Sequence, residues 1–95
     1  MIPSLVIRKI DTELNKEEIA TLEGFDPSWT SVLVPAFKPV VNIKTMCKYD
    51  RYPENVIIAI DDTSVVDTYA REIKEVKNSI KIWTFMKDGI LREVH

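Results

Sequence analysis

The strongest constraint on the fold lies in residues 55–86, where two apolar segments flank an amphipathic one. Val56–Ile60 is an unbroken apolar run rich in β-branched residues. It is too short for a buried helix and is typical of a strand covered on both faces. Ile80–Phe85 has the composition of a second strand. With a helical pattern between them, from Ser64 to Lys77, these segments predict a crossover that joins two parallel strands.

The helix expected over Ser64–Lys77 has signals at its start and along one face. Ser64 is a suitable N-cap, and Asp67 three residues later gives a variant of the capping box. The apolar residues recur at helical spacing and predict one buried stripe. That stripe consists of Val66, Tyr69, Ala70, Ile73 and Val76.

The first third of the chain predicts a strand and a short helix. Leu5–Ile10 reads as the strand. Asn15 and Glu18 have the spacing of a reciprocal capping pair that starts the helix. Gly24 then suits a left-handed residue that ends it. Two turns of helix are marginal alone, so this helix is expected to pack on a sheet.

The remaining segments complete a small α+β domain. Thr30–Val34 and the alternating residues 41–49 read as strand, broken by Pro35 and Pro39. If Thr30–Tyr49 is one bent strand, the order is β-α-β-β-α-β, which is ferredoxin-like. Asp88-Gly89 predicts a hairpin that adds Ile90–Val94 as an extra C-terminal strand, with Trp83 opposite Val94. We therefore expect two helices on one face of a mixed, mainly antiparallel sheet.

Composition narrows the class of protein more than it identifies a function. The 95 residues suit one domain, and the net charge of −2 gives no overall attraction for nucleic acid or an anionic membrane. One cysteine, no long apolar run and no signal-like start predict a cytoplasmic protein. The absence of glutamine is a weak indication of a thermophilic source. No motif calls for a cofactor.

The leading functional hypothesis is a non-enzymatic binding or adaptor protein. On the strand Ile80–Phe85, Lys81, Trp83 and Phe85 face away from Ile80 and Ile82. With helices on one side of the sheet only, the aromatic pair is either exposed, as on a partner surface, or covered by the loops around Pro35–Pro39. We therefore expect this open sheet face to bind a second copy of the chain, forming a homodimer, or another protein partner.

The first alternative is nucleic-acid binding by the middle of the chain. Basic residues interleaved with aromatic ones can hold single strands by charge and stacking. Lys44 and Lys48 share one face of their strand, whereas Tyr49 points to the other, and this weakens the idea. The residues concerned are Lys38, Lys44, Lys48, Arg51 and Tyr52.

The second alternative is a Mg²⁺-dependent phosphoryl-transfer or nuclease activity at Asp61 and Asp62. These carboxylates follow a buried strand and precede a helix, where open α/β sheets bind ligands. Acids at that position also stabilise a helix start without any ligand. Cys47 and the terminal His95 do not make a nucleophile and base or a zinc site, so no catalytic residue is assigned.

Overall fold

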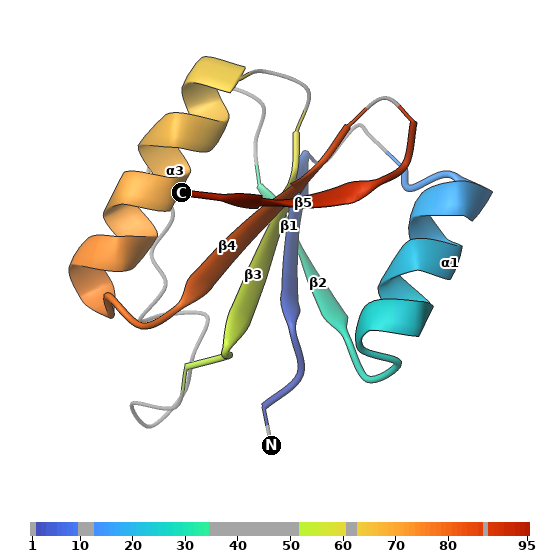
Figure 1. Cartoon of the computed structure of the whole chain (residues 1–95), viewed down its shortest axis with the longest axis horizontal. Coiled ribbons are helices and arrows are strands. Elements are labelled where there is room, and N and C mark those ends of the chain that lie inside the picture. Colours follow the sequence, from blue (N-terminus) through green and yellow to red (C-terminus); the bar gives the residue numbers. More distant parts are fainter. Residues whose placement is uncertain (1, 10–12, 35–51, 61–62, 87) are drawn as a thin grey trace.

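One mixed sheet runs through the centre of the molecule, and a helix packs against each of its faces (Figure 1). The computed structural model describes residues 2–9, 13–34, 52–60, 63–86 and 88–95. Within these residues the sheet has five strands and the molecule two helices. The elements are β1 (Leu5–Lys9), α1 (Lys16–Phe25), β2 (Thr30–Val34), β3 (Asn55–Ala59), α3 (Thr63–Val76), β4 (Lys81–Phe85) and β5 (Leu91–Val94).

The strands lie in the order β2-β1-β3-β4-β5, and only the last pair is antiparallel. Leu5 of β1 lies opposite Thr30 of β2 on one side and opposite Val56 of β3 on the other. The predicted crossover is confirmed, because β3 and β4 are parallel neighbours joined through α3. The coarse expectation, a small α+β domain with a mixed sheet, holds as well.

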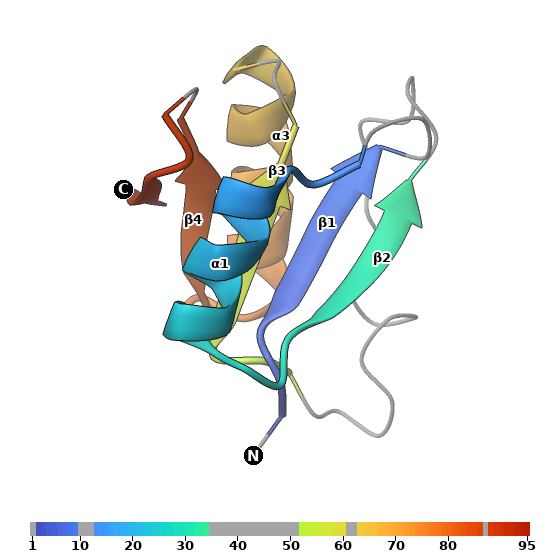
Figure 2. The same cartoon turned by 90° about the vertical axis from the view of Figure 1, so that its right-hand side faces the viewer.

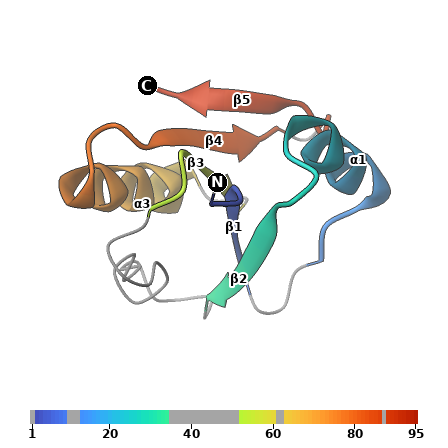
Figure 3. The same ribbon diagram turned by 90° about the horizontal axis from the view of Figure 1, so that it is seen from below.

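The finer expectation of a mainly antiparallel sheet with both helices on one face was wrong. The pairs β1–β2, β1–β3 and β3–β4 are parallel, and the ferredoxin-like order is not confirmed. Figure 3 shows α1 and α3 on opposite sides of the strands. The crossover from β1 to β2 moves outward in one direction and the crossover from β3 to β4 in the other. Crossovers of one hand then place their helices on opposite faces.

Each face of the sheet has its own core, since neighbouring residues of a strand point to opposite faces. On the α1 face, Val6 and Ile57 are buried together with Leu22 of the helix. On the α3 face, the buried residues of the helix are Val66, Tyr69 and Ile73, as the apolar stripe predicts. The strand residues of that core are Leu5, Ile7, Val34, Val56, Ile58, Ile60, Ile80 and Ile82, counted with the flanks of the strands.

The β4–β5 hairpin forms as predicted, but its register is shifted by one residue. Val94 lies opposite Ile82, and Glu93 takes the place opposite Trp83. The hairpin closes by a hydrogen bond from the Met86 N–H to the Ile90 carbonyl, which leaves three residues in the loop instead of two. Gly89 has a φ of 76°, the left-handed conformation usual in three-residue loops.

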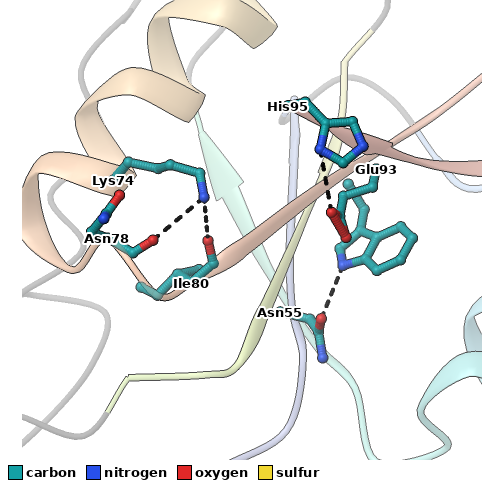
Figure 4. A network of polar contacts seen from close by, with 7 residues as sticks. Asn55, Lys74, Asn78, Ile80, Glu93 and His95 are labelled. Carbon is teal, nitrogen blue, oxygen red and sulfur yellow. Dashed lines mark hydrogen bonds and ion pairs between the residues drawn. The ribbon is translucent and has the colours of Figure 1, made fainter.

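The helix ends follow the predicted chemistry at one terminus and depart from it at two others. Asn15 and Glu18 form the reciprocal capping box that their spacing predicts. Gly24 is inside α1, which continues to Phe25, so it is not the left-handed residue that ends the helix. Ser64 is the second residue of α3 and not its N-cap. At the other end of α3, the Lys74 ammonium donates to the carbonyls of Asn78 and Ile80 (Figure 4).

The predicted strand over residues 41–49 lies outside the described residues. The described part of the expected long strand is β2, which pairs with β1. Among the described residues, no helix has the length and apolar character needed to cross a membrane.

Candidate functional site: a groove between α1 and the hairpin

Trp83 lies on the face of β4 that packs toward α1, and it is half-buried there. The ring of Phe25, the last residue of α1, meets the Trp83 ring edge-on, with centroids 5.1 Å apart and planes at 65°. The indole N–H of Trp83 donates to Asn55 Oδ1 at 2.9 Å (Figure 4). The aromatic residue is therefore on the side of the sheet away from α3, and α1 covers part of it.

A groove opens where α1 meets the hairpin, and Trp83 forms part of its wall. We call it the α1–hairpin groove. Its volume is about 590 Å³, within the size range of specific binding sites. Its lining is Glu17, Thr21 and Phe25 from α1, Trp83 and Leu91 from the strands, and Asp88, Gly89 and Ile90 from the hairpin.

Exposed apolar side chains gather at this groove. Among the described residues, four large apolar side chains are exposed: Phe25 (37%), Leu33 (45%), Met86 (48%) and Ile90 (51%). Phe25 and Ile90 line the groove, and Met86 is bonded to Ile90 at the base of the hairpin. The side chain of Met86 lines a separate cleft at the carboxyl ends of the strands, and Leu33 lies on β2. Figure 2 shows β2 to one side of α1.

The two walls of the groove are tied together by short contacts. The Thr21 hydroxyl lies 3.1 Å from the Gly89 carbonyl oxygen, across 68 residues of sequence, and 2.9 Å from the Glu17 carbonyl oxygen of its own helix, so its single proton is shared between the two acceptors. A Cβ at Gly89 would come within 3.3 Å of the Glu17 Cβ, so helix and hairpin pack closely there. The Ile90 N–H donates to Asp88 Oδ1 at 3.0 Å, which fixes the hairpin itself. These contacts hold the groove in shape without a bound partner.

The three residues predicted to bind a partner separate into different hollows. Trp83 lines the α1–hairpin groove. Phe85 lines a cleft at the carboxyl ends of the strands. Lys81 is exposed and lines a hollow at the opposite end of β4. Alternation along β4 predicts that these residues share a face of the sheet, but they are spread along the strand and line three different hollows.

The cleft at the carboxyl ends of β1, β3 and β4 lies where the strand order reverses, the usual ligand position in open α/β sheets. It measures about 350 Å³. The start of α1 faces it, but the capping box and the acids Glu17 and Glu18 already occupy that positive helix end. Its polar lining mixes both charges: Arg8, Lys9, Glu13, Asn15 and Glu18.

Asp61 and Asp62 follow β3 directly and lie outside the described residues, as does Cys47. Among the described residues, no group of three or more His, Cys, Asp or Glu side chains is placed to hold a metal ion. His95 is 85% exposed, with Nδ1 3.6 Å from a Glu93 carboxylate oxygen (Figure 4). The described residues therefore add no support to the metal hypothesis, which rests on the positions of Asp61 and Asp62 in the sequence.

The nucleic-acid hypothesis has one residue in the described part of the chain, Tyr52. The Lys77 ammonium lies 5.8 Å from the centre of the Tyr52 ring, and both residues line the hollow that Lys81 also lines. The other residues of this hypothesis lie outside the described ranges: Lys38, Lys44, Lys48 and Arg51.

Sequence reasoning missed most of the groove. From the sequence, no role is assigned to Phe25, and Ile90 is expected only as the first residue of the added C-terminal strand. The hairpin signal at Asp88-Gly89 was present, but its contact with α1 depends on which face of the sheet the helix covers. Periodicity within a segment does not contain that information.

Comparison with protein-family models, with curated proteins and with solved structures found no match. Function has to be inferred from the geometry of this chain.

Proposed function

We propose that this is a non-enzymatic binding protein that receives a partner protein in the α1–hairpin groove. The observation that supports this most directly is that Phe25 and Ile90, both exposed, line the same groove beside Trp83 and Leu91. Clustered apolar side chains on a surface are typical of interaction sites, whereas single ones are ordinary. Trp83 and Phe25 at its wall are of the aromatic type that carries much of the energy in protein interfaces.

A homodimer is one form of this proposal. The sequence places its interface on the open face of β4, and α1 covers part of that face in the structure. The accessible apolar area next to Trp83 is the groove. A two-fold dimer would bring two copies of the groove together, each filled by the other's Ile90.

The test uses Trp83 as its own reporter. In a Trp29→Phe variant, Trp83 is the remaining tryptophan, and an uncharged amphipathic Leu/Gln peptide is titrated against its fluorescence. We expect saturable binding, because the peptide's apolar face covers Phe25 and Ile90. Ile90→Ser should weaken it about tenfold, the result of losing about 1–2 kcal/mol of apolar burial.

Leu33→Ser is the matched control, since Leu33 is about as exposed as Ile90 and lies away from the groove. It should leave binding unchanged. Sedimentation velocity up to high micromolar concentration tests the second copy in the same set of variants. If the peptide does not bind and the protein stays monomeric, the proposed function is wrong.

Nucleic-acid binding stays a prediction. Its support in the described residues is the pairing of Tyr52 with Lys77 and the nearness of Lys81, which is a smaller feature than the groove.

A further inference from the structure

The charged residues that line the α1–hairpin groove have one sign. They are Glu17 from α1 and Asp88 from the hairpin, and both are exposed. They stand beside an apolar wall formed by Phe25, Trp83 and Leu91. A ligand that lies along the groove therefore meets apolar surface and negative charge together.

The helix side of the groove is mainly acidic, whereas the hairpin side has both signs, with Lys87 and Arg92 next to Asp88 and Glu93 in the sequence. Over residues 13–26 the chain has the acids Glu13, Glu17, Glu18, Glu23 and Asp26 and a single base, Lys16. Glu17 and Glu18 lie in the first turn of α1, Glu23 lies near its end, and α1 has no basic residue in its last turn. Charges that lie within a Debye length of about 8–10 Å act together on an approaching ligand.

Asp88 is only weakly neutralised by its neighbour. Arg92 Nη2 lies 3.8 Å from Asp88 Oδ2, and both side chains are at least half exposed. Exposed pairs of this kind contribute little and exchange readily with other partners. Asp88 Oδ1 meanwhile accepts the Ile90 N–H, which orients the carboxylate on the hairpin.

We infer that the α1–hairpin groove takes a segment of a partner protein that carries basic and apolar side chains together. The apolar side chains cover Phe25, Trp83 and Ile90, and Lys or Arg side chains contact Glu17 and Asp88. This inference rests on the proposed function and adds the chemistry of the partner. A second copy of this chain is disfavoured as the occupant, since a symmetric contact would bring like charges together at the groove.

The size of the groove favours a segment over a domain face. About 590 Å³ accommodates a few side chains, in the manner of a helix or strand laid along a groove with its anchors inward. The contact between Thr21 and Gly89 joins the two walls before binding, so little ordering of this chain is needed.

The test compares three amphipathic peptides that share one Leu face and differ in the polar face, which is Lys, Gln or Glu. Each is titrated against Trp83 fluorescence in the Trp29→Phe protein at low salt. The Lys peptide should bind about three- to tenfold more tightly than the Gln peptide, the gain expected from two exposed charge contacts. The Glu peptide should bind most weakly, and added salt should reduce the differences.

Substitutions then locate the effect. Glu17→Gln with Asp88→Asn should remove the advantage of the Lys peptide and leave the affinity for the Gln peptide nearly unchanged. Asn at position 88 keeps the acceptor for the Ile90 N–H. Glu23→Gln is the matched control, because Glu23 is an exposed acid of α1 that does not line the groove.

Each of the other possible results contradicts one specific part of the proposal. If the Gln or Glu peptide binds as tightly as the Lys peptide, the partner chemistry is wrong and the binding function stands. If the wild-type protein self-associates, Ile90→Ser abolishes this and no peptide binds, the occupant is a second copy. If nothing binds and nothing associates, the proposed function itself fails.

Discussion

Asp26 shows how one polar residue fixes the positions of two strands. Its Oδ2 accepts the Ser4 N–H at 2.8 Å, just before β1. Its Oδ1 accepts the Ser28 N–H at 3.0 Å and the Ser28 hydroxyl at 2.7 Å, just before β2. These donors, the Ser28 side chain first, hold the pKa of the Asp26 carboxyl well below its usual range.

This arrangement predicts a contribution of Asp26 to stability that depends on pH. Because the folded pKa is lowered, the contribution is full above the unfolded pKa of about 3.9 and declines as the pH falls below it. Asp26→Asn should lower the urea midpoint at pH 6 and should flatten the loss of stability between about pH 4 and pH 2. An equal acid sensitivity in both proteins would contradict the assignment. Glu23→Asn, at an exposed site of α1, is the control.

At the same scale, the capping residues show what local sequence can predict. Asn15 and Glu18 act within one turn of helix, so their spacing is sufficient evidence. Gly24 does not end α1, because the helix continues one residue further and Asp26 is extended before Pro27. Phe25 stays helical with its ring against Trp83, and Asp26 N–H bonds to the Leu22 carbonyl.

The two helices are attached to the sheet by different amounts of buried surface. α3 buries Val66, Tyr69 and Ile73, whereas Leu22 is the one residue of α1 that is fully buried. The remaining attachment of α1 consists of partly buried or edge contacts, including those with Trp83 and Gly89. The groove wall that α1 supplies therefore depends strongly on one leucine.

We expect Leu22→Ala to cost about 2–5 kcal/mol of unfolding free energy, the range for truncating a buried leucine. Ile19→Ala, at a half-buried position of the same helix, should cost less. Chemical denaturation followed by circular dichroism measures both. Similar losses for the two variants would show that α1 is held by its whole inner face and not by Leu22.

The hairpin illustrates a limit of prediction at the scale of elements. Asp88-Gly89 predicts the turn, and the turn is present, but a two-residue and a three-residue loop contain the same dipeptide. The extra residue moves Leu91 opposite Phe85 and Glu93 opposite Trp83. The predicted register would have placed Val94 at Trp83, and Val94 instead packs in the core on the α3 face.

At the scale of the whole molecule, the two cores share the strands that separate them. β1 and β3 contribute alternate residues to each core, such as Val6 to one and Leu5 and Ile7 to the other. Because β1 and β3 contribute to both cores, loss of either core also removes packing that holds these strands in place. The molecule should therefore unfold as one unit in spite of its two separate helices.

The corresponding experiment monitors unfolding by tryptophan fluorescence and by far-ultraviolet circular dichroism. The two Trp residues pack at the α1 face, whereas much of the helical signal comes from α3. We expect coincident transitions in the wild type, in Leu22→Ala and in Ile73→Ala. Separate midpoints for the two signals would show that the α1 layer unfolds independently.

The sequence predicts the described elements and the α3 crossover, because each depends on residues close together in the chain. It does not predict the face that α1 covers. The same β-α-β units build a ferredoxin-like sheet or the present one, and the choice depends on the order in which strands pair. The sequence therefore predicts an open face around Trp83. In the structure, Phe25 and the hairpin lie next to it.

The hydrogen bond between Thr21 and Gly89 has a consequence for the order in which the molecule acquires its function. The two walls of the groove are encoded 68 positions apart, so the helix wall is synthesised before the hairpin wall. A nascent chain that stops before Trp83 has the residues of α1 but lacks the strand and hairpin residues that line the groove. Under the proposed function, a partner would bind the chain only after both walls have been synthesised.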